Sequence, residues 1–93
     1  MIVGTVLIDI HLPGTQSLKD KRRRIKSFIS RVRNKFNVSI AEVAYNDNHR
    51  RGQIGVAVVS NDRALVDRIL SKVAALVDNE PEINMTDYQV EIF

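Results

Sequence analysis

Nine of the fourteen lysine and arginine residues of this 93-residue chain lie in one short segment, residues 15–36. The segment contains a single acid, Asp20, so its formal charge is +8, whereas the rest of the chain is −5 and the whole chain is +3. Clustered cations of this kind favour a polyanionic partner such as RNA, because phosphate groups attract ammonium and guanidinium groups in any sequence context. A solvated helix face would account for the same charges.

These bases lie at the unfavourable end of a helix predicted at residues 18–36. Ser17, with Asp20 three residues later, predicts the N-terminal cap of that helix. A helix N-terminus carries partial positive charge, so bases in the first turns are destabilising unless an anion compensates them. We therefore predict an anion site or nucleic-acid site that includes four bases of the first two turns: Lys19, Lys21, Arg22 and Arg23.

Lys21 is the most specific member of this predicted site. It falls on the apolar stripe of the helix, where leucine would bury more apolar area. The expectation is that Lys21→Leu raises the melting temperature and weakens binding of phosphate-bearing ligands. The alternative is structural: the basic side chains pair with Asp20 or with an acidic loop at residues 78–82.

A second basic cluster, His49, Arg50 and Arg51, lies in a polar turn predicted at residues 46–52. We expect this turn to lie near the start of the first helix and to extend the same binding surface. His49 and His11 lack an obvious third ligand, so no metal site is predicted. The chain has no cysteine, which excludes disulfides, iron–sulfur clusters and thiol nucleophiles, and we predict no cofactor and no catalytic residues.

The apolar periodicity predicts six elements that must position these residues. Strands are predicted at residues 2–12, 38–45, 53–60 and 86–93. Helices are predicted at residues 18–36 and, capped by Asn61 and Asp62, to about Val77. The order βαββαβ, with a hairpin between two crossover helices, predicts a ferredoxin-like α+β sandwich forming a single domain, residues 1–93. Right-handed crossovers give an antiparallel sheet of order 4-1-3-2 with both helices on one face.

Two strands carry further expectations. The strand at residues 38–45 has no clean apolar face, so we expect a bulge or an edge position. In the last strand Tyr88, Val90 and Ile92 are expected to point into the core.

The sheet face that no helix covers is expected to be flat and half apolar. Val3, Leu7, Ala57 and Val59 fall on this face and are the predicted contacts of a homodimer. A modest exposed patch on a monomer is the alternative.

Known functions of this fold can be compared with the chain. RNA readers of the RRM type stack bases on aromatic residues of the first and third strands, and Arg51-Gly52-Gln53-Ile54-Gly55 contains neither aromatic. Acylphosphatases need an arginine in the loop after the first strand, and residues 12–17 contain none. Pro13-Gly14 resembles the same loop of ACT-type amino-acid-binding domains, so a small-ligand sensor or protein-interaction module is the alternative function.

Three motifs together resemble a known family: Ser17-Leu18-Lys19-Asp20-Lys21-Arg22, Ala41-Glu42-Val43 and residues 55–62 (GVAVVSND). The chain resembles the YlxP-like family of small bacterial proteins, whose domain is of unknown function, along nearly its whole length. The resemblance implies a ferredoxin-like fold, and the family's association with translation and RNA-processing genes implies RNA as a partner. One departure lies in the hairpin, where the family often has an aromatic residue, usually Trp, at the position of His49 and Gln at that of Arg50.

The prediction is therefore a non-enzymatic, cytoplasmic accessory protein that binds structured RNA, ribosomal or translation-related, through its basic surface. No apolar run approaches the roughly twenty residues of a membrane span, and the chain opens on a strand rather than a charged leader. The alternative partner is an acidic protein.

Overall fold

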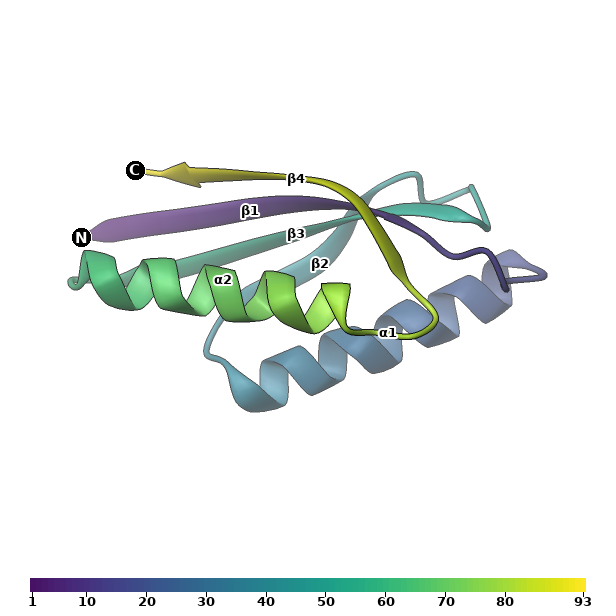
Figure 1. Ribbon diagram of the computed structural model, residues 1–93, viewed down its shortest axis with the longest axis horizontal. Helices are drawn as coiled ribbons and strands as arrows, with labels where there is room; N and C mark the ends of the chain where they lie inside the picture. The colour runs from purple at the N-terminus through teal and green to yellow at the C-terminus, as the bar shows by residue number, and fades with distance from the viewer.

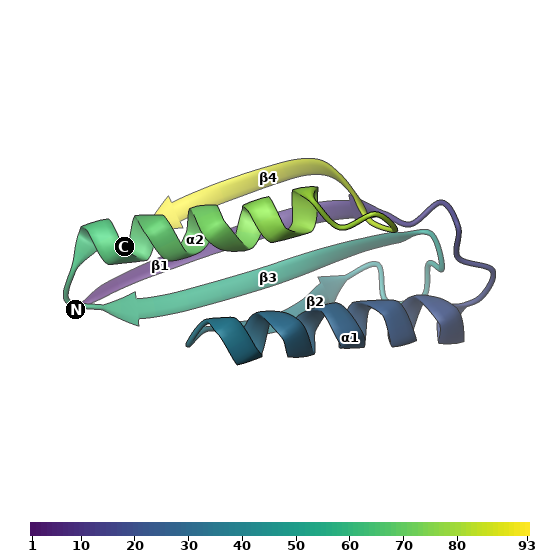
Figure 2. The ribbon, with the colours of Figure 1, turned by 60° about the horizontal axis from the view of Figure 1, so that its bottom comes forward.

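A computed structural model describes all residues, 1–93, and its elements follow the order βαββαβ. The strands are β1 (Ile2–His11), β2 (Ser39–Ala44), β3 (Arg51–Ser60) and β4 (Asn84–Ile92), and the helices are α1 (Leu18–Lys35) and α2 (Arg63–Asp78). The four strands form one antiparallel sheet of order β2-β3-β1-β4, with both helices on the same face (Figures 1 and 2). The predicted ferredoxin-like α+β fold and strand order are confirmed.

The core lies between this sheet and the two helices. Alternate residues of β1 point to the helices, and Val6, Ile8 and Ile10 are completely or almost completely buried. Apolar residues one helical turn apart pack against them from the two helices: Ile25, Phe28 and Val32 of α1, and Val66, Leu70, Val73 and Val77 of α2. Gly4 lets α2 lie close to the sheet, because a Cβ at this position would overlap the Val66 side chain.

The predicted helix caps are confirmed by hydrogen bonds. The Ser17 hydroxyl accepts the amide of Asp20 at 3.1 Å and begins α1. The Asp62 carboxylate accepts the amides of Ala64 and Leu65 and begins α2. Each cap satisfies amide groups that the first turn of a helix leaves without a partner.

Strand β2 is an edge strand with an irregularity, as its residue pattern predicts. Its pairing with β3 shifts register between Glu42 and Ala44, so Val43 forms a bulge. Tyr45 follows directly, with a φ of 61°, and begins the turn to β3. The other edge strand, β4, is longer.

Tyr88, Val90 and Ile92 of β4 lie on the predicted inward face of the sheet, and Ile92 packs against the core, but Tyr88 and Val90 are not buried. Both pair with core residues of β1, which places them on the helix-covered face of the sheet, but they are 54% and 47% exposed. The reason is the position of β4 at the sheet edge, where α2 does not cover it completely. Tyr88 and Val90 instead line a groove of about 340 Å³ between β4 and α2.

Neither helix is long and apolar enough to span a membrane.

Candidate functional site

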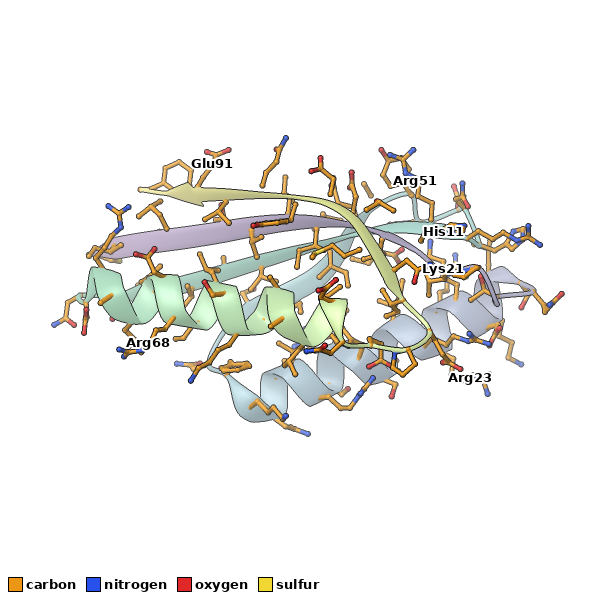
Figure 3. All side chains as sticks on the ribbon, in the orientation of Figure 1. His11, Lys21, Arg23, Arg51, Arg68 and Glu91 are labelled. Carbon is orange, nitrogen blue, oxygen red and sulfur yellow. The ribbon has the colours of Figure 1, made fainter.

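The start of α1, the loop before it and the β2–β3 hairpin lie together at one end of the molecule. Figure 3 shows His11, Lys21, Arg23 and Arg51 there, with Arg68 of α2 towards the opposite end. Hydrogen bonds connect the loops: the Leu12 amide donates to the Arg50 carbonyl at 2.8 Å, and the buried Thr15 hydroxyl contacts the His49 carbonyl. We call the predicted binding residues at this end the basic pole: Lys19, Lys21, Arg22, Arg23, His49, Arg50 and Arg51.

Lys21 lies inside the basic pole, completely buried. Its Nζ atom is 2.7 Å from the carbonyl oxygen of Tyr45, 2.5 Å from that of Asn48 and 2.9 Å from that of Arg51. It is also 2.8 Å from Oε2 of Glu42, whose side chain is 15% exposed. The lysine of α1 therefore ties the helix to both ends of the hairpin turn.

The predicted role of Lys21 in an anion site is therefore wrong. An ammonium group has three hydrogens, and the three hairpin carbonyls use all of them. The contact with Glu42 is electrostatic, which agrees with that buried oxygen having no hydrogen bond of its own. The alternative prediction, pairing of Lys21 with the acidic loop, is also wrong, because Glu42 of β2 is the acid beside it. The helical periodicity placed Lys21 on the inward face correctly, but it could not show what lies opposite.

Asp20 compensates two of the remaining bases at the start of α1. Its carboxylate accepts Arg23 Nη2 at 2.7 Å and lies 3.2 Å from Arg24 Nη2. The hydrogen bond from Arg23, with the bond and charge of Arg24 and a bond from the Gln16 amide, holds the pKa of Asp20 below its usual range. The unfavourable charges predicted at this helix end are thus partly balanced from within the chain.

The acidic loop between α2 and β4 balances a further flank of α1. Glu82 lies 3.6 Å from Arg24, and Glu80 lies 2.8 Å from Arg31. This confirms that the loop pairs with α1, although through Arg24 and Arg31 rather than through the predicted site residues. Asp78 takes part in no ion pair.

The opposite flank of α1 carries bases without acidic partners. Lys19, Arg22 and Lys26 are exposed, form no ion pair, and fall within about 60° of one another around the helix. We call these three residues the open stripe. Arg33 continues it towards β2, where its Nη2 atom donates to the Ile40 carbonyl at 2.9 Å. Sequence reasoning missed Lys26, although its spacing of four residues from Arg22 was a usable signal.

The hairpin residues of the basic pole differ in their surroundings. Arg50 is exposed and has no acidic partner, and His49 is half-buried. The guanidinium of Arg51 lies over the ring of Tyr45, 3.9 Å from its centroid. His11 is exposed and pairs with Arg51 across the sheet. No group of three His, Cys, Asp or Glu side chains lies close enough to hold a metal ion.

Comparison with known proteins assigns the chain to a family. The family described as a protein of unknown function, DUF503, matches residues 3–90. The chain is a member of the DUF503 family. The uncharacterized protein YlxP of Bacillus subtilis (strain 168) is 44% identical to it over 77 residues, which cover 83% of this chain and 84% of the relative. The resemblance of the sequence to YlxP-like proteins is therefore confirmed.

A solved structure supports the fold of this DUF503 protein. The de novo designed protein Foldit4 superposes with a TM-score of 0.55 over 98% of this chain and 96% of its own, at 17% sequence identity. At that identity the likeness concerns the arrangement of helices and strands alone.

The uncovered sheet face of this DUF503 protein carries the predicted dimer residues. Leu7 and Val59 are 39% and 58% exposed, and Val3 and Ala57 are half-buried beside them. Phe93, 69% exposed, exchanges two backbone hydrogen bonds with Val3 and extends the same face. The structure thus presents an exposed apolar patch where it was expected, and the homodimer stays a prediction.

Replacing Leu7 by aspartate tests that prediction. Because Leu7 is outside the buried core, we expect Leu7→Asp to remain folded and to lose self-association measured by light scattering at high protein concentration. Ser71→Asp adds the same charge on exposed α2 and should leave association unchanged. A wild-type protein that is monomeric under these conditions would rule out the dimer.

Proposed function

We propose that this protein is a non-enzymatic accessory protein that binds structured RNA through the open stripe and Arg50. One observation supports this above the others: the bases of α1 are divided between two flanks. Arg24 and Arg31, on one flank, are paired with acids of the same chain, whereas Lys19, Arg22 and Lys26 on the other flank have no acidic partner.

The dimensions of the open stripe suit a nucleic-acid backbone. Lys19 and Lys26 are seven residues apart, so the stripe extends about 10 Å along α1. A duplex presents one negative charge for roughly every 1.7 Å of its axis, so several phosphates lie within that length. Contacts of this kind recognise the shape and charge of the backbone rather than its sequence. RNA rather than DNA is proposed because the resemblance of the sequence to the YlxP-like family implies RNA as the partner.

A pair of matched charge reversals tests the proposal. Arg22→Glu/Lys26→Glu is expected to weaken binding to total cellular RNA at least tenfold at low ionic strength, because it removes two phosphate contacts and adds repulsion. Arg68→Glu/Lys72→Glu makes the same charge change at the same spacing on exposed α2 and should weaken binding less than threefold. Binding would be measured by filter retention or fluorescence anisotropy.

Two outcomes would contradict the proposal. Equal losses of RNA affinity in both variants would mean that binding depends only on the net charge of the protein. Absence of any RNA binding by the wild-type protein, together with capture of an acidic protein that the stripe variant fails to capture, would favour the alternative partner.

A further inference from the structure

The hairpin turn contains an exposed aromatic side chain that is not part of the open stripe. Tyr45 is 39% exposed, and Arg51 covers its ring at 3.9 Å. Tyr45 also lines an open hollow of about 650 Å³, whose other walls are polar residues of the same turn: Asn46, Asp47, Asn48 and His49. A planar ring with a guanidinium stacked on it, beside polar side chains, is a surface on which nucleic-acid bases bind.

The backbone of Tyr45 is held in an uncommon conformation. Its φ of 61° lies in the left-handed region, which a bulky residue adopts rarely and which glycine or asparagine would adopt at lower energy. The Tyr45 carbonyl accepts the Lys21 ammonium at 2.7 Å and the Asn48 amide at 3.0 Å. A strained tyrosine that is fixed in place and still exposed is expected where its ring has a use.

Polar groups in the hollow remain free to contact a ligand. Asn46 and Asp47 are exposed, and none of the protein's hydrogen bonds uses their side chains. Asn48 uses its Oδ1 atom to accept the amides of Arg50 and Arg51, which leaves its side-chain amide hydrogens available. Amide and carboxylate groups of this kind hydrogen-bond the edges of bases.

We propose that this hollow binds an unpaired nucleobase of RNA, which stacks on the Tyr45–Arg51 pair. The proposal deepens the proposed function and rests on it, since the open stripe would hold the phosphates of the same RNA. Lys21 connects the two surfaces: its ammonium binds the Tyr45 carbonyl, and Arg22 of the stripe is its neighbour in the chain. The RNA that fits is a stem with an unpaired loop or bulge rather than a continuous duplex.

Two RNA probes separate the hollow from the stripe: a stem-loop with an unpaired loop, and a fully paired duplex with the same number of phosphates. Wild-type protein should bind the stem-loop roughly tenfold more tightly, the typical effect of one stacked base. Tyr45→Gly removes the ring and suits the positive φ, so it should stay folded and lose this preference while keeping duplex binding. Arg51→Lys keeps the positive charge but removes the planar guanidinium, so this variant should also lose the preference for the stem-loop.

Arg68→Lys is the matched control, because it makes the same substitution at an exposed position of α2 towards the opposite end of the molecule; the stem-loop preference should be retained. In amide NMR spectra, residues 45–49 should shift with the stem-loop and not with the duplex. Equal affinity of wild-type protein for the two RNAs, or a preference that survives Tyr45→Gly, overturns the nucleobase site and leaves duplex binding by the stripe intact. A preference that survives Arg22→Glu/Lys26→Glu with unchanged affinity overturns the stripe instead, and absence of binding to either RNA overturns both proposals.

Discussion

Lys21→Leu should destabilise the protein strongly, the opposite of what helix periodicity alone indicates. The substitution leaves the carboxylate of Glu42 without its cation and the carbonyls of Tyr45, Asn48 and Arg51 without their donor. Removing one partner of a buried ion pair typically costs about 3–5 kcal/mol of unfolding free energy. In a chain of this size that corresponds to a fall in melting temperature of more than about 10 °C, measurable by circular dichroism.

Two further variants identify the cause of that loss. Lys26→Leu makes the same substitution at an exposed position of the same helix and should change the unfolding free energy by no more than about 0.5 kcal/mol. Lys21→Leu/Glu42→Leu also removes the stranded carboxylate and should recover part of the loss, although the hairpin carbonyls still lack a donor. A melting temperature that rises in Lys21→Leu would mean that apolar burial outweighs the contacts of the ammonium.

RNA binding should weaken by roughly a hundredfold when monovalent salt is raised from about 50 to 200 mM. In the proposed interface, four basic residues are exposed, lack an acidic partner and are available to phosphates: Lys19, Arg22, Lys26 and Arg50. Each phosphate contact releases a counterion and contributes about −0.9 to the slope of log affinity against log salt, so about four contacts give a slope near −3.6. Titrations at several salt concentrations give this slope directly.

The slope also reports which basic side chains contact RNA phosphates. Arg22→Glu/Lys26→Glu should reduce its magnitude by about 2, whereas Arg68→Glu/Lys72→Glu on α2 should leave it unchanged. A binding constant that does not respond to salt would show that the partner docks on an apolar surface, such as the uncovered sheet face. The paired residues Arg24 and Arg31 should contribute less to the slope than the open stripe, since acids already neutralise them.

The local patterns of the sequence determined the fold. Strand alternation at residues 2–12 marked the buried set Val6, Ile8 and Ile10 because side chains of a strand alternate between faces. Ser17 and Asp62 marked the helix starts because their side chains satisfy amides only two or three residues away. The irregular pattern of residues 38–45 predicted a bulge or an edge position, and the strand has both, with the bulge at Val43. These patterns depend on residues that are close together in the sequence, so they predict the elements and their order. The element order and the right-handedness of crossovers then predict the sheet order.

The partner and the exposure of each basic residue in the candidate site were decided by the tertiary structure. Nothing near Lys21 in sequence shows that its ammonium meets carbonyls 24 to 30 residues away, or that Arg31 meets Glu80. Tyr88 occupies the predicted sheet face but is exposed, because burial at an edge strand depends on how far a neighbouring helix reaches. A residue's charge and spacing are local properties, whereas its partner and exposure depend on which distant segment the fold places opposite it. The division of α1 into a neutralised flank and an open stripe is therefore a property of the folded chain.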